Sequence, residues 1–167
     1  MQTFLPYESF RESAKVLDWR RLGKQRVEGM QIINAIEGKK RKDGKPYKGW
    51  INHPATVMWR PYVNALKHYT NIIIKEWVDR GYNNNMKIYD FNNMVKPHWI
   101  GKEEFHSSHR ANLLRKDYEY YSQLVKPGGY FLFHVVSKLS HTTTNLLASS
   151  DILKKSLLTS IVVFSCK

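Results

Sequence analysis

The sequence is short of cysteine and of acidic residues, and each shortage limits what the protein can be. Its single cysteine, Cys166, excludes an internal disulfide and a cysteine-rich metal site, and is typical of a reducing compartment. Only 14 aspartates and glutamates stand against 27 lysines and arginines, which gives 167 residues a formal net charge of +13. This excess favours a polyanionic partner, with nucleic acid as the first candidate and an anionic membrane as the second.

Long apolar runs and common enzyme motifs are also missing. The first residues contain neither a basic stretch nor a long apolar run, so no secretory signal is predicted. The apolar run at residues 157–166 is shorter than the about 20 residues that span a bilayer. We therefore expect a cytoplasmic, intracellular protein with no membrane association.

The absence of three motifs narrows the enzyme classes. The sequence has no glycine-rich phosphate loop, no serine nucleophile elbow and no paired acidic metal motif, which removes most hydrolase, kinase and nucleotide-binding functions. His106 and His109 have a three-residue spacing but no third ligand that the sequence places beside them. No metal site is predicted.

Helical periodicity covers most of the first 124 residues. Helical spacing, capping residues and helix breakers predict helices over the following ranges: 9–17, 17–38, 54–81 with a division at Pro61, and 101–124. The helix before Gly81 is predicted to be core and not chemistry. Residues 83–97 read as a long connection, and residues 130–136 are strand-like. We predict an all-α fold, a compact single-domain helical bundle over residues 1–125 with an irregular C-terminal tail over residues 126–167.

The stretch from Leu17 to Gln31 is the most informative. Asp18 is expected to cap its helix. The apolar face is predicted to consist of Leu22, Val27, Met30 and Ile33, and the polar face of Arg21, Lys24, Gln25 and Glu28. A face that combines an amine, an amide, guanidinium groups and a carboxylate can support amine catalysis at a sugar carbon. It can equally be an ordinary solvated charged face.

Two glycines interrupt this helix. Gly23 and Gly29 each cost about 1 kcal/mol relative to alanine in a helix interior. A close approach by another backbone or by a ligand would explain them, and so would a bend near Gly23.

Further residues are candidates for contact with phosphate. Residues 38–49 carry six lysines and arginines against one acid, so they read as a flexible basic loop that either contacts phosphate or is a solvated linker. His106, His109, Arg110 and Arg115 are candidates for phosphate contact or for simple exposure. His53 before Pro54 is more typical of a packed or capping histidine. Trp19 and Trp59 are candidates to stack on bases or to pack in the core.

Several segments together resemble a known family. The matching segments are Met-Gln-Thr-Phe-Leu-Pro-Tyr at the start, Leu17 to Glu28, Gly49 to Pro54, Glu76 to Gly81 and Phe105 to Asp117. They are similar to bacterial and phage proteins of the pyrimidine-dimer DNA glycosylase superfamily, over about residues 1–124. The resemblance implies an all-helical monomer that binds duplex DNA, flips a nucleotide, cleaves the glycosidic bond and nicks the strand through an imine, with no cofactor.

The resemblance also implies roles for residues of this chain. In the phage enzymes an N-terminal α-amine is the nucleophile and a glutamate is essential. Here Met1 or Lys24 is the candidate amine, Glu28 or Asp18 the candidate acid, and Gln25 a group that orients the sugar or base. The candidate DNA-binding residues are Arg20, Arg21, Arg26, His53, Trp59, His106, His109, Arg110 and Arg115.

Three hypotheses follow, of which the last, an RNA-binding or membrane-surface protein, is supported only by the charge and the apolar tail. The first is a DNA repair glycosylase, with possible AP lyase activity, that acts on damaged or modified bases in duplex DNA. The second is a catalytically inactive DNA-binding or DNA-structure-sensing module on the same scaffold. It is favoured by the triplet Trp19-Arg20-Arg21, which stands where the family has an aromatic residue, arginine and glutamate.

Overall fold

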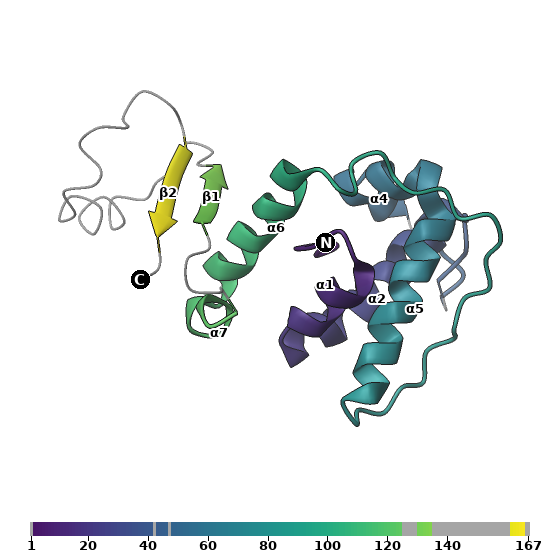
Figure 1. Cartoon of the computed structure of the whole chain (residues 1–167). Helices are drawn as coiled ribbons and strands as arrows, with labels where there is room; N and C mark the ends of the chain where they lie inside the picture. Colours follow the sequence, from purple (N-terminus) through teal and green to yellow (C-terminus); the bar gives the residue numbers. More distant parts are fainter. Residues whose placement is uncertain (1, 42, 47, 125–129, 135–160, 166–167) are drawn as a thin grey trace. The chain divides into compact units, whose positions relative to one another are not determined.

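The computed structural model describes residues 2–41, 43–46, 48–124, 130–134 and 161–165 (Figure 1). The chain forms two compact units, residues 1–106 and 107–167, and each is described by itself. The first unit is all-α, as predicted. Its elements are α1 (Phe10–Val16), α2 (Trp19–Ile36), α3 (Lys48–Ile51), α4 (Pro54–Trp59), the 3-10 turn η1 (Arg60–Tyr62), α5 (Val63–Asp79) and the first turn of α6 (Glu103–Lys116).

The ends of these helices follow the signals in the sequence. The side chain of Asp18 accepts hydrogen bonds from the backbone N–H groups of Arg20 and Arg21, which confirms the predicted cap of α2. Gly38 follows the end of α2 with a φ of 65°. Pro61 lies in η1, which divides α4 from α5 as predicted.

The core of the first unit lies between α2 and α5. These two helices pack against each other, and α1 packs on α5, as Figure 1 also shows. The glycines of α2 explain how closely the helices approach. A Cβ on Gly23 would lie 2.8 Å from Cζ3 of Trp77, and a Cβ on Gly29 would clash with the side chain of Thr70. Side chains of α5 therefore make the close approach at both glycines.

The predicted long connection is confirmed. Residues 83–97 contain no helix or strand, and α5 holds them along its length. The side-chain amide of Asn71 makes a hydrogen bond to the backbone carbonyl of Tyr89 at 2.8 Å and accepts one from its N–H at 2.9 Å. The predicted basic loop contains a tight turn, in which the Arg41 N–H donates to the carbonyl of Lys45 at 2.8 Å.

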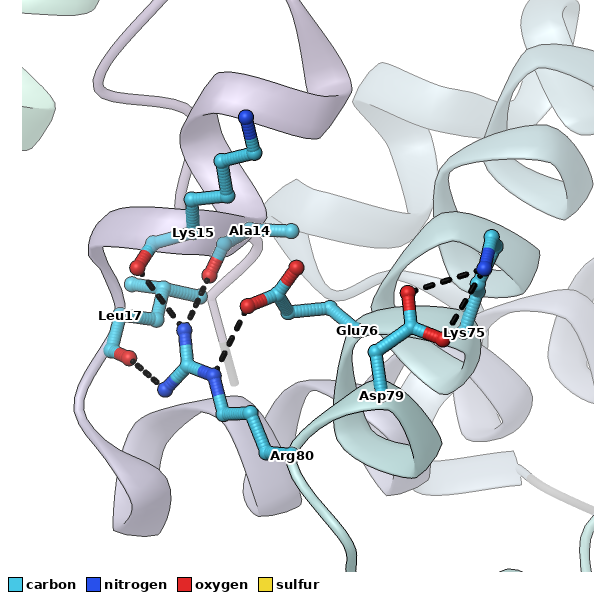
Figure 2. A network of polar contacts seen from close by, with 7 residues as sticks. All are labelled: Ala14, Lys15, Leu17, Lys75, Glu76, Asp79 and Arg80. Carbon is cyan, nitrogen blue, oxygen red and sulfur yellow. Dashed lines mark hydrogen bonds and ion pairs between the residues drawn. The ribbon is translucent and has the colours of Figure 1, made fainter.

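Arg80 ties the end of α5 to the end of α1 (Figure 2). Its guanidinium donates to the carbonyl of Leu17 at 2.7 Å and to that of Lys15 at 2.8 Å, and it also contacts the carbonyl of Ala14. Glu76 accepts a hydrogen bond from Arg80 Nε at 2.8 Å. Carbonyls at a helix C-terminus lack partners within their own helix, so Arg80 stabilises α1 by capping it.

Replacing Arg80 with methionine is expected to lower the free energy of unfolding by about 2 kcal/mol, because the carbonyls of α1 lose a charged donor. Urea denaturation followed by circular dichroism measures the loss. The matched control is Lys75→Met, which breaks the exposed Lys75–Asp79 pair of the same helix (Figure 2) and should cost less than about 0.5 kcal/mol. Equal losses in the two variants would contradict the capping role.

The second unit contains the rest of α6, α7 (Tyr118–Ser122) and two strands, β1 (Tyr130–His134) and β2 (Ile161–Ser165). The strands pair antiparallel, with Tyr130 opposite Ser165. The strand-like prediction for residues 130–136 is confirmed as far as His134, whereas β2 was not predicted. The predicted domain boundary after residue 125 lies among residues outside those described and stays a prediction.

Candidate active site

The polar face predicted for α2 is wrong in part. Gln25 is 1% exposed and Glu28 is 8% exposed, whereas Val27, predicted to be in the core, is 40% exposed. Burying a carboxamide and a carboxylate is unfavourable unless both are hydrogen-bonded. The partners come from the first residues of the chain and from α5, two segments whose positions helical periodicity does not indicate.

The segment from Gln2 to Leu5 is anchored at every residue. Side chains of α2 contact the backbones of Gln2 and Phe4. The hydroxyl of Thr3 accepts a hydrogen bond from Trp59 Nε1 at 2.9 Å, and the carbonyl of Leu5 lies 2.8 Å from Nδ1 of His106. Residues 2–5 are thus held in one place, although segments near a terminus often fray.

Gln25 is the centre of the network. Its Oε1 accepts hydrogen bonds from the Phe4 N–H at 2.9 Å and from the Tyr69 hydroxyl at 2.8 Å. Its Nε2 donates to the carbonyl of Gln2 at 2.7 Å and to Glu28 Oε2 at 2.9 Å. A glutamine amide has two donors and two acceptor sites, so Gln25 is fully satisfied and its orientation is defined by its partners.

Glu28 lies beside the backbone of Gln2 and next to a lysine. Its Oε2 accepts a hydrogen bond from the Gln2 N–H at 3.3 Å, in addition to the bond from Gln25. Its Oε1 lies 3.7 Å from Nζ of Lys24, whose side chain is 73% exposed. Glu28 is therefore a buried carboxylate with the exposed side chain of Lys24 beside one of its oxygens.

Tyr69 completes the network from α5. It is fully buried, and its hydroxyl lies 3.0 Å from the carbonyl of Phe4 as well as 2.8 Å from Gln25 Oε1. Burial raises the pKa of Tyr69 strongly and the negative charge of Glu28 raises it further. The phenol is therefore neutral at physiological pH and serves as a hydrogen-bond donor.

The other acid predicted for catalysis lies far from this network. Asp18 begins α2, ten positions before Glu28, which corresponds to about 15 Å along the helix. Its Oδ2 lies 2.6 Å from Nη1 of Arg21. The structure therefore brings Lys24, Gln25 and Glu28 together and leaves Asp18 with Arg21 at the N-terminus of the helix. Met1, the other candidate amine, lies outside the described residues.

Two residues predicted to contact DNA are part of the core. His106 is 3% exposed, and its ring nitrogens lie 2.8 Å from the carbonyl of Leu5 and 2.9 Å from the N–H of Gly101. Trp59 is 0% exposed and packs edge-on against Trp99. Both side chains hold the N-terminal segment through long-range contacts, and for Trp59 this is the core packing that the sequence left open beside stacking.

The remaining candidates in the first unit have different surroundings. His53 caps α4, because its Nδ1 accepts a hydrogen bond from the Ala55 N–H at 3.2 Å. Arg20 is exposed at the first turn of α2, and its guanidinium lies over the ring of the exposed Trp19 at 5.2 Å. Trp19 lies nine positions before Glu28, about two and a half turns, and so on the opposite face of the helix.

Arg26 is held by the neighbouring helix. Its guanidinium lies 4.0 Å from the ring centre of Trp77, and its Nη1 donates to Asn84 Oδ1 at 3.0 Å. Burial lowers the pKa of Arg26, and the guanidinium stays charged because an ordinary arginine titrates far above neutral pH. Arg26 is thus a fixed cation on α2.

Three candidates belong to the second unit. His109 is buried, Arg110 is half-exposed and Arg115 is exposed. Arg115 makes a hydrogen bond to the side chain of Asn112. Their predicted contact with phosphate stays a prediction.

The sequence did not indicate that Thr3 and Tyr69 contact the residues of the site. Tyr69 is buried in the core, as predicted for this face of α5, but its hydroxyl belongs to the site. A tyrosine on a buried apolar face carries a hydroxyl that needs a partner, and this signal indicates a polar contact nearby. Thr3 has no such signal, since an isolated threonine in a short apolar segment is common.

The described parts of the chain contain neither a cluster of metal-binding side chains nor a helix that could span a membrane. Within these parts no group of three or more histidine, cysteine, aspartate or glutamate side chains comes close enough to hold a metal ion. None of the helices among these residues is long and apolar enough to cross a membrane.

A match to a model of a known protein family identifies the family of the chain. A family model described as pyrimidine dimer DNA glycosylase matches residues 1–90, which include the N-terminal segment and the helices from α1 to α5. No curated protein and no solved structure matched the chain significantly. The matched residues are more than half of the sequence and contain the network around Gln25 and Glu28 apart from His106. The chain therefore belongs to the pyrimidine dimer DNA glycosylase family.

Proposed function

We propose that this protein is a DNA glycosylase with AP lyase activity, acting on damaged or modified bases in duplex DNA, pyrimidine dimers first among them. The observation that carries the proposal is the hydrogen bond at 3.3 Å between the backbone N–H of Gln2 and Glu28 Oε2. It holds the first peptide group of the chain against a buried carboxylate. An amine and a carboxylate at one place are the two groups that imine chemistry at a sugar requires.

The proposed nucleophile is the α-amine of Met1. Three covalent bonds separate the nitrogen of residue 1 from that of Gln2, which keeps the two atoms within about 3.7 Å of each other. A free α-amine has an ordinary pKa near 8, so a fraction of it is unprotonated at neutral pH. Lys24 is the second candidate, because its Nζ lies 3.7 Å from the same carboxylate.

One amine and the carboxylate of Glu28 account for the bonds and protons of the proposed reaction. The lone pair of the amine forms a bond to C1′ of the sugar while the bond from C1′ to the base breaks, and the base leaves with the bonding electrons and gains a proton. Opening of the sugar ring gives an imine. Loss of a C2′ proton then expels the 3′-phosphate, and water hydrolyses the imine to restore the amine. Glu28 is the proposed carrier of these protons.

Cations outside the network are the proposed phosphate contacts. Arg20 and Arg26 lie on α2, and the exposed residues Lys40, Arg41 and Lys45 lie in the basic loop. Such contacts fix the register of the protein on duplex DNA without reading its sequence. One copy of the chain supplies every group named, so the proposed active form is a monomer with no cofactor.

Borohydride trapping tests the proposal. A duplex with one abasic site is incubated with the protein and sodium borohydride, and a covalent protein–DNA adduct is expected on a denaturing gel. Without borohydride the expected product is a nicked strand. A duplex with a single ultraviolet-induced dimer tests base removal, and an undamaged duplex is the control. Binding to damaged duplex with neither adduct nor nick would overturn the proposal.

The second candidate function is a catalytically inactive module that binds damaged or distorted DNA. One observation favours it: Arg21 occupies the place of the expected glutamate, and its guanidinium is engaged by Asp18 at 2.6 Å. On this alternative, Glu28 and Gln25 only anchor the start of the chain. The trapping experiment separates the two candidates directly.

A further inference from the structure

We propose that Tyr69 is a positioning residue for the imine chemistry, which acts through Gln25 and Phe4 and does not touch the DNA. The inference rests on the proposed function, because it concerns how the amine and the carboxylate are held together. Neither the helical pattern of α5 nor the family match assigns this role to Tyr69.

The hydroxyl of Tyr69 joins two parts of the site. It lies 2.8 Å from Gln25 Oε1 on α2 and 3.0 Å from the carbonyl of Phe4 in the N-terminal segment. Its one proton is shared between these two acceptors. A single buried group on α5 therefore restrains the distance between the start of the chain and the helix that carries Glu28.

The same contact restrains the orientation of Gln25. The Phe4 N–H and the Tyr69 hydroxyl both point at Oε1, which leaves Nε2 to bind the carbonyl of Gln2 and the carboxylate of Glu28. Rotation of the amide by half a turn would place its oxygen against the carboxylate and its N–H groups against the Phe4 N–H. Tyr69 thus helps to keep the donor end of Gln25 directed at Glu28.

The surroundings make this hydroxyl immobile. The ring of Tyr69 packs edge-on against Phe10 at 5.5 Å and stacks on Trp59 at 6.2 Å. The side chain is 0% exposed, so it cannot leave its partners for water. A rigid support behind the reacting groups preserves catalytic geometry, and a displacement of about 1 Å in such a site can cost about a hundredfold in rate.

The test is Tyr69→Phe, which deletes one oxygen and keeps the ring in place. The rate of borohydride trapping on an abasic duplex, measured in single turnover, is expected to fall about tenfold to a hundredfold. The dissociation constant for the same duplex should change less than about twofold, because Tyr69 is buried and does not contact phosphate. Circular dichroism establishes that the variant is folded.

A matched control destabilises the fold outside the network. Arg80→Met removes the hydrogen bonds to the carbonyls at the end of α1 but touches neither Gln25 nor Glu28. It is expected to lower the melting temperature about as much as Tyr69→Phe while its trapping rate stays close to that of the wild-type protein. If both variants slow trapping equally, Tyr69 only stabilises the fold and the inference is overturned.

A double mutant separates action through Gln25 from independent action. If Tyr69 works partly through Gln25, then Tyr69→Phe should slow the Gln25→Leu variant by a smaller factor than it slows the wild-type protein. Fully additive effects would overturn the inference. Wild-type protein that forms no adduct would refute the proposed function itself, whereas a wild-type adduct together with an equally fast Tyr69→Phe variant would refute only the role of Tyr69.

Discussion

Replacing Glu28 with glutamine is expected to lower the rate of imine trapping and of strand nicking by about a hundredfold or more, which is the usual loss when a general acid or base is removed. A glutamine at this position has the shape of glutamate and can still accept hydrogen bonds from Gln25 and from the Gln2 N–H. The variant should therefore fold and bind DNA. Single-turnover trapping on an abasic duplex measures the loss, and fluorescence anisotropy measures the binding.

The matched control is Asp18→Asn, which alters the other buried carboxylate of α2. Asparagine still caps a helix, so the fold should be retained, although the charge that faces Arg21 is lost. Trapping by this variant should remain near the wild-type rate. The opposite ranking, with Asp18→Asn inactive and Glu28→Gln active, would move the reacting carboxylate to the beginning of α2.

Blocking the α-amine of Met1 by acetylation is expected to reduce the trapped adduct to background. An acetylated nitrogen has no basic lone pair and cannot form an imine. The variant Lys24→Met, with a free Met1, should still be trapped. Tryptic digestion of the wild-type adduct followed by mass spectrometry locates the attached sugar, and the expected site is the first peptide, residues 1–11.

One set of results would change the assignment of the nucleophile. An adduct that survives acetylation, disappears in Lys24→Met and maps to residues 22–26 would identify Lys24 as the nucleophile. Glu28 would keep its role in that case, because its Oε2 binds the N–H of Gln2, the residue after Met1, and its Oε1 lies 3.7 Å from Lys24 Nζ. The carboxylate thus has the same role with either amine.

Glu28 lies further along α2 than the position at which the family resemblance places a glutamate. Arg21 stands where the resemblance places that residue, and Glu28 follows seven positions later, about two helical turns. Seven residues return to nearly the same face of a helix, so the side chains of positions 21 and 28 project in similar directions. The N-terminal segment meets this face at Gln25 and Glu28, which is why a carboxylate two turns further along is the one beside the start of the chain.

Much of the fold was predictable because its signals are local. The cap at Asp18, the division at Pro61 and the glycine after α2 depend on residues within one or two turns of each other. The same holds for the buried face of α5, where Leu66, Tyr69 and Ile73 recur at helical spacing and are all buried. Backbone geometry and hydrophobic period determine such features whatever the rest of the chain does.

The candidate site was predictable only as a set of residue types. The sequence by itself placed Lys24, Gln25 and Glu28 on one helix and favoured a polyanionic partner, whereas amine chemistry on DNA was implied by the family resemblance. Only the tertiary structure decided that Gln25 and Glu28 are buried, that Tyr69 binds Gln25, and that His106 and Trp59 hold residues 2–5. The physical reason is that a polar side chain is buried only where distant segments supply its hydrogen bonds, and no local pattern on α2 encodes the arrival of residues 2–5.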